Sequence, residues 1–136
     1  MKKYKSKIGW GIVALIALIL GTEIAIFTFN KQWNGLIILL PVTIFIAYVF
    51  LSIHYLIGEN DLIVKSAFGM KTTLNINSIK KIKETNNPIS SPATSLDRIE
   101  VFYGKQSVII SPKRKTEFIN HLLSINPKIE VIYKAK

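Results

Sequence analysis

Two apolar segments dominate the first part of the chain, at residues 8–29 and at residues 36 to about 57. A helix needs roughly 20 mostly apolar residues to cross the hydrocarbon core of a bilayer, and each segment reaches that length. Only residues 30–35 separate the segments, so two helices here would form a tight hairpin. The pattern therefore predicts a two-helix transmembrane anchor followed by a more polar domain.

The period of the apolar pattern changes near the end of the second segment. A strand-like alternation begins at His54, so the second helix is expected to end just before it. We expect helices at about residues 8–29 and 36–53, which together give a transmembrane anchor over residues 1–53. The remainder, residues 54–136, is expected to form one small domain on the cytoplasmic side.

The distribution of lysines predicts the orientation of this anchor. Four lysines, at positions 2, 3, 5 and 7, precede the first apolar segment, whereas Lys31 alone lies between the two segments. Cytoplasmic flanks of membrane helices are enriched in Lys and Arg, so both termini are expected in the cytoplasm and the connecting loop outside. The chain contains no cysteine, which excludes a disulfide framework and a thiolate metal site.

Glu23 interrupts the first apolar segment about six residues before its outer end. An ionisable side chain inside a membrane helix is a functional candidate, for example as a contact to a partner helix in a transport accessory. The alternative is that Glu23 reaches the outer interface or is protonated, without a function of its own.

Beyond the anchor, alternating apolar residues predict a series of short strands that turns separate. The expected strands are residues 54–57, 62–68, 72–76, 79–85, 96–103 and 107–110, with a short edge strand at 129–132. Ser111 and Pro112 are suited to the start of a helix, and Asn126 and Pro127 to its end. The apolar stripe of this helix, at a spacing of 3.6 residues, consists of Phe118, Ile119, Leu122, Leu123 and Ile125. The predicted class is α+β: an antiparallel β-barrel or sheet that a C-terminal helix caps.

The residues 91–99, the residues 110–113 and Phe118 resemble the YyaB-like family of bacterial PH domains. In that family a pair of membrane helices precedes a small PH-like domain, so the resemblance implies a multi-pass protein of the bacterial cell membrane. It covers roughly residues 54–127 and implies no biochemical activity. The first hairpin, residues 57–62, is acidic, so the basic phosphoinositide site of other PH domains does not carry over.

Basic residues of the domain form clusters that could face an anionic membrane. Each Lys or Arg near such a surface contributes on the order of 1 kcal/mol, and a tethered domain loses little further entropy on docking. The alternative is an ordinary solvated surface. The candidate membrane-surface residues are Lys80, Lys81, Lys83, Lys113, Arg114 and Lys115.

The segment 86–95 is rich in Pro, Ser and Asn, and so long an irregular stretch is unusual in a small domain. It is a candidate site for a protein partner, although a simple connector would have the same composition. Asp97 and Arg98, which follow it, either bind a partner or hold the segment in place through hydrogen bonds. The candidate residues for partner binding are Pro88, Ser91, Pro92, Ser95, Asp97 and Arg98.

The sequence offers little support for catalysis. His54 and His121 lie in different predicted elements, and no metal-ligand spacing or glycine-rich phosphate loop occurs, so we expect no cofactor. Nucleic-acid binding is disfavoured because no aromatic residues interleave with the basic clusters. We expect a non-enzymatic, membrane-anchored interaction module that contacts the lipid bilayer and a protein partner, with self-association left open. The alternative is a membrane protein that confers immunity to a bacteriocin.

Overall fold

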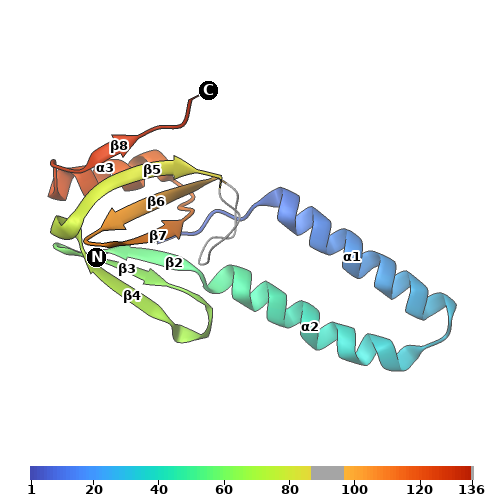
Figure 1. Ribbon diagram of the computed structural model, residues 1–136. Coiled ribbons are helices and arrows are strands. Elements are labelled where there is room, and N and C mark those ends of the chain that lie inside the picture. The colour runs from blue at the N-terminus through green and yellow to red at the C-terminus, as the bar shows by residue number, and fades with distance from the viewer. Residues whose placement is uncertain (87–96, 136) are drawn as a thin grey trace.

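The computed structural model describes residues 1–86 and 97–135 (Figure 1). Two long apolar helices project from a β-rich domain, and a shorter helix, α3, packs on that domain. The helices are α1 (Trp10–Phe29), α2 (Trp33–Ser52) and α3 (Lys115–Ile125). The strands are β1 (Lys2–Lys5), β2 (His54–Ile57), β3 (Asp61–Lys65), β4 (Lys71–Asn75), β5 (Ile79–Thr85), β6 (Arg98–Tyr103), β7 (Gln106–Ile110) and β8 (Glu130–Ile132).

The first sheet has the order β1-β2-β3-β4 and is antiparallel throughout. Its amino-terminal strand β1 was not expected from the sequence. Tyr4 is buried against the core while Lys3 and Lys5 face outwards, and Lys5 lies opposite His54 of β2. The amino-terminal residues therefore contribute to the sheet of the domain. The division of the chain at residue 53 stays a prediction.

The helical hairpin is inserted between two paired strands of this sheet. The apolar helices α1 and α2 follow β1 and precede β2, and none of their residues is buried. Both are long and apolar enough to cross a membrane by length and composition, with mean hydropathies of 2.4 and 2.5. Because β1 pairs with β2, the hairpin leaves and re-enters the domain at one place (Figure 1).

The bounds of the two helices differ slightly from the expected ones. α1 begins at Trp10 because the backbone just before it is engaged elsewhere: the N–H of Lys7 donates to the carbonyl of Ser111 at 2.6 Å. α2 begins at Trp33, three residues before the predicted start. Gly35, in the first turn of α2, allows the two helices to approach each other closely here, because a Cβ at this position would lie 2.7 Å from the ring of Phe27 on α1.

The second sheet has the order β7-β6-β5-β8, and β8 pairs with β5 in parallel. The predicted edge strand near residues 129–132 is therefore present. The predicted barrel is not: over the described residues the two sheets remain separate and do not close. An antiparallel bridge between Ser6 and Pro112 joins the end of β1 to the segment after β7. The α+β class is confirmed.

Pro112 does not start the C-terminal helix, contrary to the sequence-based expectation. The bridge to Ser6 holds Pro112 in extended backbone, and the N–H of Lys113 donates to the carbonyl of Lys5 at 3.0 Å. α3 therefore begins only at Lys115. Its buried stripe of Phe118, Ile119 and Leu122 matches the predicted apolar face.

The core lies between the two sheets and α3, and Tyr55 is its largest fully buried side chain. Its hydroxyl donates to Ser6 Oγ at 3.2 Å and accepts from the backbone N–H of Ser111 at 3.1 Å. Burial raises the pKa of this hydroxyl above its ordinary value of 10.0. Tyr55 thus connects β2 with the segments that follow β1 and β7.

Tyr55→Phe should lower the free energy of unfolding by roughly 1–3 kcal/mol, because it leaves the buried N–H of Ser111 without this acceptor. The measurement is thermal or denaturant unfolding of the full chain in detergent. Tyr103→Phe is the matched control, since within the described residues its hydroxyl makes no hydrogen bond and its side chain is only partly buried. Equal effects of the two substitutions would contradict this role of Tyr55.

Candidate functional site

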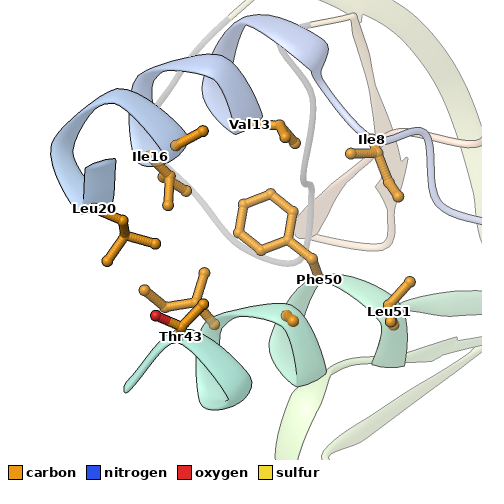
Figure 2. A pocket seen from close by; sticks show the side chains of 10 residues that line it. Ile8, Val13, Ile16, Leu20, Thr43, Phe50 and Leu51 are labelled. Carbon is orange, nitrogen blue, oxygen red and sulfur yellow. The ribbon is translucent and has the colours of Figure 1, made fainter. Parts of the chain in front are cut away.

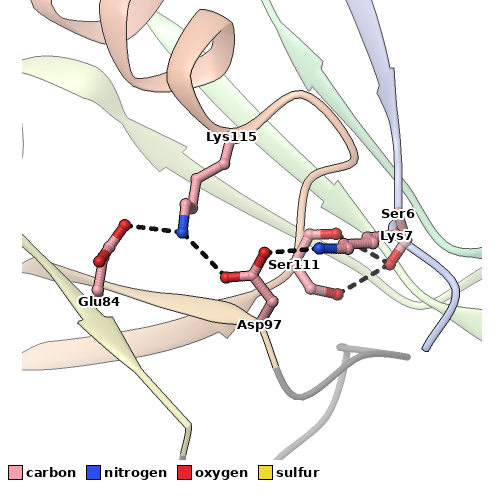
Figure 3. A network of polar contacts seen from close by, with 6 residues as sticks. All are labelled: Ser6, Lys7, Glu84, Asp97, Ser111 and Lys115. Carbon is pink, nitrogen blue, oxygen red and sulfur yellow. Dashed lines mark hydrogen bonds and ion pairs between the residues drawn. The ribbon is translucent and has the colours of Figure 1, made fainter. Parts of the chain in front are cut away.

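An ion-pair network lies where the helical hairpin meets the second sheet (Figure 3). Lys115 Nζ contacts Glu84 Oε1 at 2.7 Å and Asp97 Oδ1 at 2.9 Å, and Lys7 Nζ contacts Asp97 Oδ2 at 2.7 Å. The four residues come from the segment before α1, the end of β5, the residue before β6 and the first residue of α3. Asp97 is therefore the centre of a clamp between parts of the chain that are distant in sequence.

The pKa values in the network follow from these contacts. Hydrogen bonds from Lys7 and then Lys115 hold the pKa of Asp97 below its ordinary 3.8. Hydrogen bonds from Lys115 and from the backbone N–H of Lys134 hold the pKa of Glu84 below 4.5. Burial lowers the pKa of Lys115, but its bonds to Glu84 and Asp97 outweigh burial, and the net shift is upward. All three groups are thus charged at neutral pH, as a structural clamp requires.

This network contains two of the predicted site residues. Lys115 was expected on the membrane-facing surface, but its ammonium group is directed into the network and its side chain is 26 % exposed. Asp97, a candidate for partner binding or for holding the segment 86–95, forms ion pairs with Lys7 and Lys115, and its predicted role stays a prediction. Arg98 is buried at the start of β6, opposite Thr85. Pro88, Ser91, Pro92 and Ser95 lie outside the described residues.

Lys113 and Arg114 join the amino-terminal lysines in one basic surface. Together with Lys2, Lys3 and Lys5 they line a cavity of about 320 Å³ beside β1. Glu117 is the one acidic residue in its wall, and it pairs with Lys2 and Arg114. We call this set of five cations the basic surface. An excess of positive charge in a concave surface attracts anions.

The remaining predicted basic cluster lies elsewhere, on β5. Lys80 and Lys83 are exposed, and Lys81 Nζ lies 4.8 Å from the centre of the Phe102 ring, a cation–π geometry. The structure therefore divides the six predicted basic residues among three places: β5, the basic surface and the ion-pair network.

A second cavity of about 330 Å³ lies between the two apolar helices, and Phe50 points into it from α2 (Figure 2). Its lining is apolar except for Thr43, whose hydroxyl donates to the carbonyl of Leu39. Glu23 does not line this cavity and is exposed on α1. Within the described residues Glu23 has no ion-pair partner, so its function stays a prediction.

A profile of the bacterial PH domain family matches residues 53–126, more than half of the chain. The chain belongs to the bacterial PH domain family. The match begins at Ile53, directly after α2, and continues through the whole of α3. The search of curated proteins gave no match, and neither did the search of solved structures.

Membership in this family favours binding over catalysis, because PH domains are generally non-catalytic interaction modules that commonly bind lipids or proteins. Among residues 1–86 and 97–135, no group of three or more His, Cys, Asp or Glu side chains could hold a metal ion. Neither the family nor any described residue favours the bacteriocin-immunity alternative. The candidate functional site of this bacterial PH domain is therefore a binding surface.

The amino-terminal part of that surface was missed by sequence reasoning. Lys2, Lys3 and Lys5 were assigned only to the orientation of the anchor, whereas they belong to a strand and line a cavity. The one indication of this strand in the sequence is Tyr4, an apolar residue among lysines. A pattern of four residues is too short to distinguish a strand from a basic flank.

The ion-pair network should make folding stability depend on pH. A carboxyl group whose pKa is lower in the folded state stabilises the fold above its unfolded pKa, and this contribution disappears as the pH falls. The thermal midpoint should therefore decrease from about pH 5 to pH 3, as Asp97 and Glu84 become protonated. In Lys115→Met this decrease should be shallower. The free energy of unfolding at pH 7 should fall by roughly 1 kcal/mol or less, because solvent screens the ion pair with Asp97, whose side chain is 43 % exposed.

The measurement is thermal unfolding of the full chain in detergent over that pH range. Lys128→Met is the control, since Lys128 is exposed and its side chain forms no ion pair with any residue that the structure describes. Parallel pH profiles for the wild type and Lys115→Met would show that the network does not contribute.

Proposed function

We propose that this chain is a non-enzymatic interaction module whose PH domain is held at the cytoplasmic face of the bacterial membrane by a two-helix anchor. The observation that carries the proposal is the pairing of β1 with β2 on either side of α1 and α2. Two strands in one sheet lie on one side of a membrane, so the hairpin between them has to cross the bilayer twice. No residue of either helix is buried by the protein, which leaves their apolar surfaces to lipid.

The lysine distribution supports the cytoplasmic side for the domain. Four lysines precede α1, whereas Lys31 is the only charged residue between the two helices. This asymmetry favours a cytoplasmic domain and an external connection. The basic surface lies next to the start of α1, where anionic lipid headgroups of the inner leaflet would be within reach. We infer that it contributes to docking the domain on that leaflet.

A protein partner completes the proposal. β4 is an edge strand of the first sheet, so a partner strand could extend that sheet by backbone hydrogen bonds. The segment 86–95, with Asp97 at its end, is the second place for a partner. Within the family, the sequence at residues 91–99 and 110–113 and Phe118 support assignment to the YyaB-like branch.

Cysteine labelling of intact cells tests the topology, and the natural chain contains no cysteine to interfere. Gln32→Cys, between α1 and α2, should react with a membrane-impermeant maleimide added outside. Lys105→Cys, in the turn between β6 and β7, should react only after the membrane is permeabilised. Protection of position 32 together with external labelling of position 105 would reverse the proposed orientation. Labelling of both positions from outside would reject the anchor.

A further inference from the structure

A groove of about 310 Å³ lies at the base of α2, where the helix meets the outer face of the first sheet. It is separate from the acidic hairpin between β2 and β3. One wall comes from the last two turns of α2, and the other comes from the first sheet and the turn after β3. Tyr48 and Leu51 line the groove from α2, and Lys3, His54 and Lys65 line it from the sheet.

The sheet side of this groove is basic. Lys5, His54, Lys65 and Lys71 lie opposite one another across β1, β2, β3 and β4, in a single row at the helix end of the sheet. Residues opposite each other in an antiparallel sheet share a face, and Lys3 shares it because it lies two residues before Lys5. Among the described residues, none of these four lysines takes part in an ion pair.

The turn between β3 and β4 presents apolar side chains next to this basic row. Phe68 and Met70 are each 62 % exposed, although both are large and apolar. The Phe68 ring lies 5.5 Å from the ring of Phe45 on α2. Phe45 precedes the last residue of α2, Ser52, by seven residues, which is about 10 Å along the helix axis. The turn therefore lies beside the apolar part of the helix.

We propose that this groove binds the phosphate headgroup of an anionic phospholipid, with the turn of residues 67–70 embedded in the same leaflet. The inference rests on the proposed membrane anchor. Lys3 and Lys65 donate to the phosphate oxygens from the sheet, and Lys71 contacts an adjacent headgroup. Phe68 and Met70 lie among the acyl chains next to α2.

The two walls of the groove select a lipid over a soluble phosphate. Tyr48 and Leu51 belong to a helix that continues into the bilayer, and tyrosine is favoured at the level of the headgroups. Lysine side chains can follow apolar surface with their methylene groups while the ammonium group reaches the headgroup layer. An acyl chain that leaves the groove along α2 thus meets an apolar surface.

Native mass spectrometry of the detergent-solubilised full chain tests the site, with dioleoyl phosphatidylglycerol as the probe. Lys65→Gln/Lys71→Gln removes two lysines of the row and leaves the basic surface unchanged. It should weaken binding of this lipid by roughly tenfold or more. Lys65→Arg/Lys71→Arg keeps the charge and should bind within about threefold of the wild type, because each contact remains charged.

The matched control is Lys105→Gln/Lys128→Gln, which makes the same charge change at the opposite end of the domain. Lys105 follows β6, and Lys128 precedes β8, whose pairing starts near the beginning of β5. Equal losses in the control and in Lys65→Gln/Lys71→Gln would overturn the groove in favour of non-specific attraction. Equal binding of dioleoyl phosphatidylcholine would overturn the preference for an anionic lipid. Displacement of the lipid by glycerol 3-phosphate at an equal concentration would overturn the lipid as occupant.

Spin labels in reconstituted phosphatidylglycerol vesicles test the position of the turn and separate this inference from the anchor. Labels are placed at Met70→Cys in the turn, at Leu18→Cys in the middle of α1 and at Lys105→Cys as the aqueous control. Relaxation by oxygen should exceed relaxation by a water-soluble nickel complex at positions 18 and 70, and the order should reverse at position 105. A buried label at position 18 with an aqueous label at position 70 overturns the embedded turn and leaves the anchor intact. Aqueous labels at both positions overturn both proposals.

Discussion

The antiparallel pairing of β1 with β2 is the constraint on which the rest of the arrangement depends. It joins residues that are separated by the whole helical hairpin, and it brings the two ends of that hairpin to adjacent positions, Lys5 and His54. Two paired strands lie on the same side of a bilayer, so under the proposed anchor the hairpin between them crosses the membrane and returns. The domain and the helices are thus one structure rather than a module on a tether.

The connections between helices and sheet are short. Ile53 alone separates α2 from β2, and it is buried. On the other side, Ser6 and Lys7 precede α1, and both are held by contacts to Ser111 and Asp97. Few backbone bonds at either junction are free to rotate, so the orientation of the sheet relative to the helices is restricted. A surface that is already oriented towards its ligand loses less entropy on binding than a surface on a flexible linker.

Local sequence patterns predicted much of this fold. The strands at residues 54–57 and 79–85 have the predicted bounds, and the buried stripe of α3 is the predicted one. These elements are recognisable because the spacing of their apolar residues is enough to predict which face is buried. The family match over residues 53–126 agrees with the part of the resemblance that concerned a bacterial PH domain.

The features that sequence reasoning missed depend on contacts between distant segments. Lys115 resembles its basic neighbours in the sequence, yet its partners Glu84 and Asp97 are brought to it only by the packing of α3 on the second sheet. β1 is recognisable only once β2 is beside it. The groove at the base of α2 is formed by Lys3, Tyr48 and Lys65, which no local pattern connects. Long-range pairing decides these positions, and single-sequence periodicity carries no information about it.

The bridge between Ser6 and Pro112 has a consequence for the order of events during synthesis. The first strand leaves the ribosome long before residues 110–118, which supply Ser111, one of the hydrogen-bond partners of Ser6, and part of the core. Contacts of such sequence separation form late, because the intervening chain has to be ordered first. Under the proposed topology, the domain closes only after both helices have been inserted and the chain has returned to the ribosomal side. Incorrect insertion of the helices would then leave this bridge unformed, and with it the part of the core that residues 110–118 supply.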